Sequence, residues 1–302
     1  MFTGLLLATV LSVQLDPSPI WMVRGDDFGV THAGNVGLEE AIESGLLTSA
    51  SVIVNGAWIA ETASILLRHP EVEVGLHVTL SSEWDVLRWP STSADAPTLV
   101  APDGNMWRGG VTWLSPYARE NDPPLYAALD VDPADIEREI RAQVDRAASL
   151  GLTLDYIDCH NWAACTGSAL PILRMIANEL GVPIPESERD DGAGTPPMMR
   201  YTDTEAENSR RRMGHDYEAY RDALLADIEA MEPGGVYRSV FHPWPDTDEV
   251  RAMDTVRGPE EAVIRSNELR LLSDPLIRGA IQGKSIRLMG PAAVARTQGQ
   301  IP

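Results

Sequence analysis

Ionisable side chains follow several short apolar segments of this sequence. The segments at 20–23, 72–76, 154–157 and 236–241 are rich in aliphatic residues, which is typical of buried parallel strands. The carboxyl ends of parallel strands meet at one face of an α/β fold, so we expect two carboxylates and three imidazoles to meet at one rim. These side chains are, in chain order, Asp26, Asp27, His77, His160 and His242.

This set of side chains has the composition of a hydrolytic metal site. One carboxylate and two imidazoles make three metal ligands and leave positions for water and a substrate oxygen. A second carboxylate beside the first must take a proton or face the cation, because like charges repel, and this suits a general base. A histidine across the site can then protonate the leaving group. The predicted chemistry is metal-assisted hydrolysis of an amide or an ester.

Strand and helix patterns alternate along the chain. The predicted strands are 20–23, 49–54, 72–76, 154–157, 182–184, 236–241 and 285–288. The predicted helices are 33–44, 59–68, 133–150, 168–180, 217–231 and 260–273, several of which stop before Gly or Pro. This alternation predicts an α/β fold with parallel strands, and it favours a single barrel over two domains.

The remaining segments define the predicted domain organisation. Residues 1–18 are either an export signal or an apolar N-terminal segment packed on the domain, so export and a cytoplasmic location are equally expected. Residues 19–302 form one barrel domain, with loop excursions at about 81–132 and 187–216. The first excursion carries tryptophans that either bury the loop or stack on a sugar ring. They are Trp84, Trp89, Trp107 and Trp113.

The composition excludes several classes of partner. Asp and Glu number 45 against 24 Lys and Arg, which gives a formal net charge of −21. This charge repels polyanions, so we expect neither nucleic acid nor an anionic membrane surface as a partner. No apolar stretch is long enough for a membrane span. Two cysteines, Cys159 and Cys165, cannot build a disulfide scaffold, and Cys159 is predicted to be a small buried thiol.

A series of motifs resembles the YdjC-like carbohydrate deacetylases. The motifs are RGDDFG, GVTHAGN, GLHVTL, DYIDCHNW, SVFHPW and RSNELRLL, and they extend over roughly Met22 to Leu288. The resemblance implies a deformed (β/α) barrel with the site at the carboxyl ends of its strands. It also implies a divalent metal ion, Mg²⁺ or Zn²⁺, and the removal of an N-acetyl group from an amino sugar, typically in a chito-oligosaccharide.

The same resemblance implies a role for each of the five ionisable residues. Asp27, His77 and His160 match the family's metal ligands. Asp26 matches the general base that deprotonates a metal-bound water molecule. His242 matches the histidine of an HPG-like motif, and we assign it as the acid for the leaving group.

Two motifs depart from the family pattern. The family usually has further histidines after the ligand histidine, in a D-G-H-x-H pattern, whereas Asn161 and Trp162 follow here, and Trp244 stands where the family has glycine. Trp162 and Trp244 are predicted to line the site, because aromatic faces stack on sugar rings. Arg265 and Glu268 match an R-x-x-E-L stretch and are expected to support or line the site, with Arg265 a candidate substrate contact.

Other functions are compatible with the same residue types. A non-catalytic carbohydrate-binding protein with a relic metal site would account for the lost histidine. Two histidines and one carboxylate also bind iron in iron oxygenases, but that function does not explain why Asp26 stands beside Asp27. Carboxylates suit Mg²⁺ and imidazoles suit Zn²⁺, so ligand types alone do not name the metal. The sequence does not identify the acetylated sugar. It also does not distinguish a monomer from a homodimer.

Overall fold

A computed structural model describes residues 17–109, 130–165, 167–185, 201–204 and 213–301 of the chain. Residues 1–16 of the predicted N-terminal segment, Trp113 and most of the second excursion lie outside these ranges.

The described strands form one sheet of parallel pairs in the order β4-β3-β2-β1-β6-β5, with β7 paired to the start of β1. The strands are β1 (Ile20–Phe28), β2 (Ser49–Val52), β3 (Glu73–Val78), β4 (Tyr156–Cys159), β5 (Thr202–Asp203), β6 (Val236–Phe241) and β7 (Arg287–Leu288).

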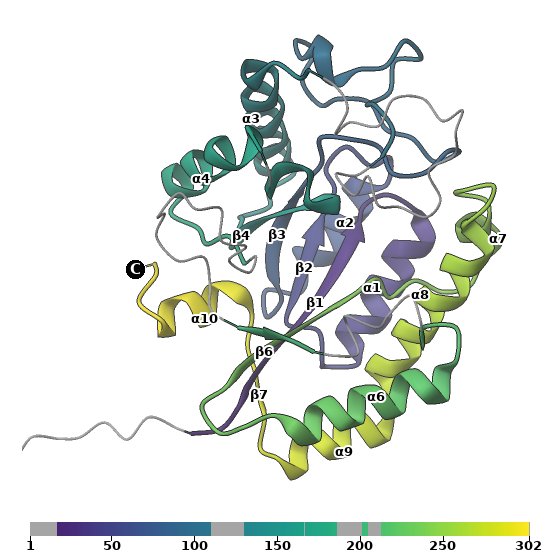
Figure 1. The fold of residues 1–302 in the computed structure, drawn as a ribbon, viewed down its shortest axis with the longest axis vertical. Helices are drawn as coiled ribbons and strands as arrows, with labels where there is room; N and C mark the ends of the chain where they lie inside the picture. Colours follow the sequence, from purple (N-terminus) through teal and green to yellow (C-terminus); the bar gives the residue numbers. More distant parts are fainter. Residues whose placement is uncertain (1–16, 110–129, 166, 186–200, 205–212, 302) are drawn as a thin grey trace, which may run out of the picture.

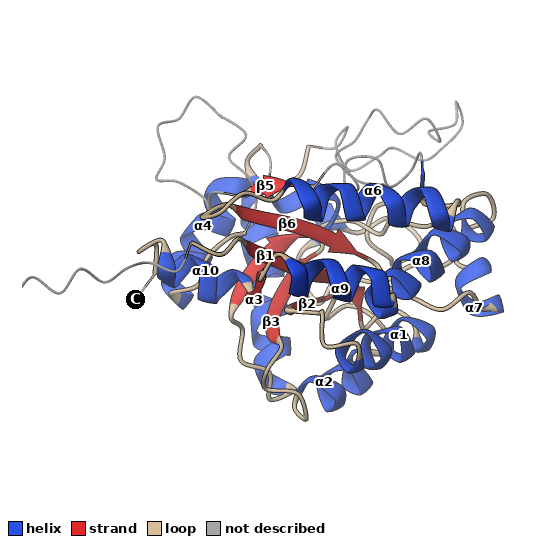
Figure 2. Ribbon diagram, turned by 90° about the horizontal axis from the view of Figure 1, so that it is seen from below, coloured by secondary structure: helices blue, strands red, loops and turns tan. Residues whose placement is uncertain are grey.

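Helices flank the curled sheet (Figures 1 and 2). They are α1 (His32–Glu43), α2 (Ile59–Leu66), α3 (Pro133–Ser149), α4 (Ala169–Leu180), α6 (Tyr217–Ala230), α7 (Asp248–Arg251), α8 (Gly258–Ser273), α9 (Pro275–Gly283) and α10 (Pro291–Thr297), with 3-10 helices η1 (Pro97–Leu99) and η3 (His160–Cys165). The two end strands, β4 and β5, do not pair with each other among the described residues, so the predicted deformed (β/α) barrel is confirmed as an open half-barrel. None of the helices in these ranges has the length and apolar character needed to cross a bilayer.

Strand β1 lies in the middle of the sheet and delivers charged residues to its carboxyl edge. Its first half is apolar, and Trp21, Met22 and Val23 are fully buried. β6 pairs with β1 over Ile20–Gly25 on one side, and β2 pairs with its second half on the other. A strand with neighbours on both sides and helices on its faces needs such a continuous apolar run. The charged residues that follow this run are therefore held at the centre of the edge.

Most predicted elements are present, with shifts at their ends. β1 extends past residue 23 to Phe28, because the polar residues there continue to pair with β2 and β6. The predicted strand 182–184 is wrong. A single backbone hydrogen bond of 3.1 Å, from Ile157 N to Pro183 O, joins this segment to β4, and proline has no N–H to continue a ladder. The short helices α7, α9 and α10 were missed because so few turns give little periodicity.

The segment 81–109 lies at the carboxyl edge of the sheet and is anchored to α3 (Figure 1). Glu139 of α3 is fully buried and accepts hydrogen bonds of 3.0 and 2.8 Å from the backbone N–H groups of residues 92 and 93. Trp84 and Trp89 lie in the hydrophobic core, and Trp107 is half-buried. Trp84 and Trp89 therefore bury this loop, and they present no face for a sugar to stack on.

Helix α1 packs closely against the loop after β6. A Cβ atom at Gly37 would lie 1.8 Å from the carbonyl oxygen of Pro243. We expect Gly37→Ala to lower the free energy of unfolding by about 1–3 kcal/mol in urea denaturation, although alanine favours a helix. Gly279→Ala in α9 is the matched control, because its Cβ would meet no atom within 4 Å, and it should be neutral or stabilising. Equal stability of the two variants would contradict the close packing.

Candidate metal centre

Two consecutive aspartates reach one site from the end of β1. Successive residues of a regular strand point to opposite faces of the sheet. The pairing of β1 with β2 shifts register between Gly25 and Phe28, and Asp27 has a left-handed φ of 66°. This irregularity acts as a β-bulge, which redirects a side chain. As a result, Oδ2 of Asp26 and Oδ1 of Asp27 lie 3.7 and 3.5 Å from the same atom, Nε2 of His77.

Asp27, His77 and His160 form a compact set of ligand-type groups. His77 lies on β3, and His160 is the first residue of η3. Nδ1 of His160 is 3.1 Å from Oδ1 of Asp27, and one ligand atom from each of the three residues lies within 4.8 Å of the others. Oδ1 of Asp27 is buried and makes no hydrogen bond to the described residues. Two nitrogens and an oxygen in this arrangement fit a divalent metal ion with open positions.

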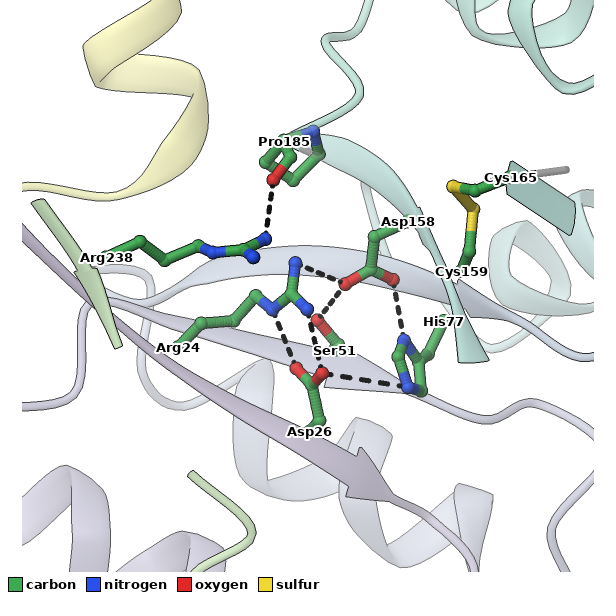
Figure 3. Close-up of a disulfide and its surroundings, with 9 residues drawn as sticks. All are labelled: Arg24, Asp26, Ser51, His77, Asp158, Cys159, Cys165, Pro185 and Arg238. Carbon is green, nitrogen blue, oxygen red and sulfur yellow. Dashed lines mark hydrogen bonds and ion pairs between the residues drawn. A yellow bond between two sulfur atoms is a disulfide. The ribbon is translucent and has the colours of Figure 1, made fainter. Parts of the chain in front are cut away.

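A buried network behind His77, which was not predicted from the sequence, orients it (Figure 3). Asp158 accepts a hydrogen bond of 2.8 Å from Nδ1 of His77 and one of 2.7 Å from the hydroxyl of Ser51. Nη1 of Arg24 lies 3.0 Å from Asp158, while its Nε and Nη2 each lie 2.8 Å from Asp26. A histidine that donates from Nδ1 to a carboxylate presents Nε2 as a metal ligand.

The sequence contains a partial signal for this network. Arg24 and Asp26 are two residues apart on β1, so strand alternation places them on the same side. Asp158 lies opposite His77 in the pairing of β4 with β3. Alternation along one strand is visible in a sequence, but the register between two strands is not, so Asp158 was missed.

The outer nitrogen of His160 faces two polar groups. Nε2 lies 3.0 Å from Nδ2 of Asn161 and 3.6 Å from Oε2 of Glu83. Oε1 of Glu83 is 3.2 Å from Nη1 of Arg257, which holds the carboxylate in place. Glu83 belongs to no motif and lies in the first excursion, so no sequence signal pointed to it. Each candidate ligand histidine therefore has a carboxylate on the side away from Asp27.

Arg265 and Trp244, which are predicted to contact substrate, are buried, and contact of either residue with substrate stays a prediction. Their exposed fractions are 2% and 0%. Nη2 of Arg265 lies 3.1 Å from Oδ2 of Asp27, and its guanidinium stacks 4.2 Å from the centre of the Trp244 ring. Arg265 therefore fixes the second oxygen of Asp27, and Trp244 supports Arg265. Trp244 lies inside because the loop after β6 folds against α1. Trp162 is half-buried, and its contact with substrate stays a prediction.

His242 lies on the open side of the site. Its side chain is 20% exposed, whereas the side chains of Asp27 and His160 are almost completely buried. Nε2 of His242 lies 3.7 Å from Oδ2 of Asp27. Glu268 is fully buried behind the histidine, accepts a hydrogen bond of 2.7 Å from its backbone N, and has Oε2 3.7 Å from its Nδ1. His242 is thus held from behind and faces both the ligand set and solvent.

Buried aspartates outnumber the arginines that pair with them around the ligand set. Asp26, Asp27 and Asp158 are buried there, and two buried arginines, Arg24 and Arg265, pair with them in the described structure. A buried charge without a partner is strongly destabilising. A divalent cation between Asp27 and the histidines would compensate the remaining negative charge.

These charges shift two pKa values in opposite directions. Burial raises the pKa of Asp27, but the surrounding histidines, His242 first among them, outweigh burial and hold this pKa well below its usual range. Burial lowers the pKa of His77, but Asp158 and Asp26 outweigh it and hold this pKa well above its usual value. The same carboxylates that favour a proton on His77 would favour a metal ion in its place.

Cys159 and Cys165 form a disulfide, so the prediction of a thiol at Cys159 is wrong. Both residues are buried, as predicted for Cys159. Cys159 is the last residue of β4 and Cys165 the last of η3, so the bond closes a short ring that contains His160. The sequence did not reveal the bond because residues six apart can be joined only where the chain turns back, as it does in η3.

Comparison with known proteins places these features in a family. The sequence model of the YdjC-like proteins matches residues 21–283. A carbohydrate deacetylase of Brevibacillus brevis is 32% identical over 163 residues, which are 54% of this chain and 57% of the relative. The chain thus spans less than two thirds of the length of the first curated relatives it matches. A carbohydrate deacetylase of Vibrio parahaemolyticus is 25% identical over 280 residues, which are 91% of this chain and 96% of the relative.

One solved structure supports the fold. It comes from Enterococcus faecalis and is named for cellobiose-phosphate cleavage. It superposes on this chain with a TM-score of 0.67 and 19% sequence identity. The match covers 91% of this chain and 98% of the Enterococcus chain. At this sequence identity, the similarity supports the shared fold and no statement about function.

The metal-free protein is expected to lose stability as the pH rises. The unfolded chain binds the His77 proton with an ordinary pKa of 6.5, and the folded protein binds it more tightly. This stabilisation is complete below about pH 6.5 and disappears as the pH rises through the raised pKa. In the presence of a chelator, urea denaturation should show a steeper alkaline loss for the native protein than for His77→Gln. His215→Gln, at an exposed histidine, is the control. Parallel curves for the native protein and His77→Gln would contradict tighter proton binding.

Proposed function

The chain belongs to the YdjC-like family, and we propose on that premise that it is a metal-dependent hydrolase that removes an N-acetyl group from an amino sugar or a chito-oligosaccharide. The observation that carries the proposal is the buried cluster of Asp27, His77 and His160, with the carboxylate of Asp26 beside it. The names of the curated relatives, which are carbohydrate deacetylases, support the substrate class.

Asp27, His77 and His160 would hold the metal ion, either Zn²⁺ or Mg²⁺. When bound, such a cation makes a water molecule more acidic and stabilises negative charge on the acyl oxygen. The two imidazole nitrogens favour Zn²⁺, whereas the carboxylate also suits Mg²⁺. The excess of buried carboxylates over arginines supports retention of a cation at this position.

Asp26 would accept a proton from water at the ligand set. Its Oδ2 lies 3.7 Å from Nε2 of His77, the nitrogen that faces Asp27. A hydrogen bond from Nη2 of Arg24 to Oδ2 and an ion-pair contact from its Nε to Oδ1 orient the carboxylate, and each oxygen keeps a lone pair for another partner. A general base needs this combination of fixed orientation and a free acceptor site. Arg24 is therefore a positioning residue for the proposed base.

His242 is the proposed acid. The water oxygen bonds to the acyl carbon and Asp26 takes the water proton. The bond from the acyl carbon to nitrogen then breaks, and His242 supplies the proton that the departing amine needs. The products are acetate and a free amino sugar. The partial exposure of His242 gives substrate access to it, and Glu268 holds its position from the buried side.

Acetate release from N-acetylated sugars tests the proposal. Metal-stripped protein would be assayed on monomers to oligomers of N-acetylglucosamine, with Zn²⁺ or Mg²⁺ added back. We expect metal-dependent release of acetate, and a reduction in kcat of about 10²- to 10⁴-fold in Asp26→Asn with metal binding retained. Asp145→Asn, at an exposed position on α3, is the matched control and should keep full activity.

Two results would count against these assignments. Full activity in Asp26→Asn would show that another group accepts the proton. No acetate from any sugar, with stoichiometric metal bound, would favour a different acyl substrate or a carbohydrate-binding protein with a relic site. Oxygen consumption by the iron-loaded protein would favour the oxygenase chemistry that the same ligand types permit.

His242→Ala separates the roles of acid and ligand. Because its Nε2 faces Asp27 from the open side, we expect this variant to slow turnover by about 10²-fold or more while it binds metal with native stoichiometry. Metal content by atomic absorption and kcat on the best substrate are the two measurements. Loss of metal together with activity would make His242 a ligand. His215→Ala controls for the removal of a histidine and should change neither quantity.

A further inference from the structure

A disulfide encloses one of the proposed metal ligands. Cys159 and Cys165 are bonded, and their Cα atoms are 5.8 Å apart. Figure 3 shows the bond at the carboxyl end of β4, beside the strand that carries His77. The residues between the two cysteines begin with His160, so the ligand is the first residue inside the ring.

The turn inside this ring has an unusual backbone. Asn161 and Trp162 both have left-handed φ values, 49° and 63°, and neither is glycine. L-amino acids with a Cβ atom rarely adopt this conformation, and it persists where the surroundings impose it. The turn starts at the residue after His160, and it brings Nδ2 of Asn161 to 3.0 Å from Nε2 of His160.

Both ends of the ring are attached to fixed parts of the fold. Cys159 pairs with Val78 in the register of β4 with β3, next to the pair of His77 with Asp158. Cys165 is buried in the hydrophobic core at the end of η3. The disulfide therefore ties the far end of the turn to the same strands that hold His77.

We propose that this disulfide positions His160 and makes metal binding at the site sensitive to reduction. The inference rests on the proposed role of His160 as a ligand. In the oxidised protein the turn is constrained, and Nδ1 of His160 faces Asp27 at 3.1 Å. Reduction removes the only covalent constraint that the described structure places on the turn, and the left-handed residues can then relax. A metal-binding side chain that becomes ordered only when the metal binds loses conformational entropy at that moment. The reduced protein therefore binds metal less tightly.

The chemistry of the switch is thiol–disulfide exchange with a dithiol. One thiolate of the dithiol attacks a cysteine sulfur and forms a mixed disulfide, and its second thiolate then displaces that sulfur. The bond between Cys159 and Cys165 is reduced to two thiols, and the dithiol is oxidised to a disulfide. Burial of both cysteines slows access, so the exchange requires local opening of the turn.

Metal affinity in defined redox states tests the inference. Zn²⁺ affinity would be measured by competition with a chromophoric chelator in three samples. These are the oxidised protein, the protein reduced with a phosphine that is then removed under anaerobic conditions, and the double variant Cys159→Ser with Cys165→Ser. Thiol counting defines each state. We expect the double variant to bind Zn²⁺ at least about tenfold more weakly than the oxidised protein, the size of effect typical of lost ligand support. Reductant should not change its affinity further.

The double variant decides the outcome, because free thiolates can themselves bind Zn²⁺ in the reduced native protein. Equal affinity of the double variant and the oxidised protein, with both folded by circular dichroism, would overturn the inference. Restoration of native affinity when the reduced native protein is reoxidised would support it, and failure to restore it would count against it.

His160→Ala distinguishes failure of this inference from failure of the proposed function. If His160→Ala keeps native affinity, the ligand assignment itself is wrong and the inference falls with it. If His160→Ala loses metal while the double variant keeps it, only the inference fails. Acetate release is measured separately, so a redox effect on Zn²⁺ binding without any deacetylation would leave the inference standing and refute the proposed reaction.

Discussion

The site depends on one departure from regular strand geometry at the end of β1. A regular strand would send the carboxylates of Asp26 and Asp27 to opposite faces of the sheet. The left-handed φ of Asp27 and the shifted register with β2 turn both toward His77. Two neighbouring carboxylates can then take different tasks, one as a ligand and one as an acceptor of protons. Without this turn the histidines from β3 and η3 would face a single carboxylate.

Bringing two carboxylates together creates an electrostatic problem that the surrounding residues solve. Arg24 lies between Asp26 and Asp158, and Arg265 lies against the far oxygen of Asp27. Neither arginine lies between Asp27 and the histidines. Arginines therefore neutralise the outside of the cluster and leave its centre to a metal ion. Buried aromatic rings complete this arrangement, since Arg265 stacks on Trp244 and cannot swing out to solvent.

One of the two departures from the family pattern lies beside the candidate ligand His160, at the end of β4. The residue after His160 is an asparagine whose amide lies at the outer nitrogen of that histidine, and Glu83 approaches the same nitrogen from the first excursion. The disulfide then closes over the turn. Where the family usually has a second histidine, this chain thus has polar contacts to His160 and a covalent constraint on the turn.

The sequence by itself determined the fold class and the identity of the chemical groups. Apolar runs that end in Asp or His predict buried parallel strands with a functional edge, because burial and strand direction follow from residue type and order. Only the tertiary structure decided which atoms meet. The sequence did not predict the contacts of Asp158 and Glu83 or the burial of Trp244, because strand register, loop packing and the turn at Asp27 depend on contacts between segments distant in the chain. The bond of Cys159 to Cys165 depends in the same way on how η3 turns back, and no pattern of residue types along one segment specifies such contacts.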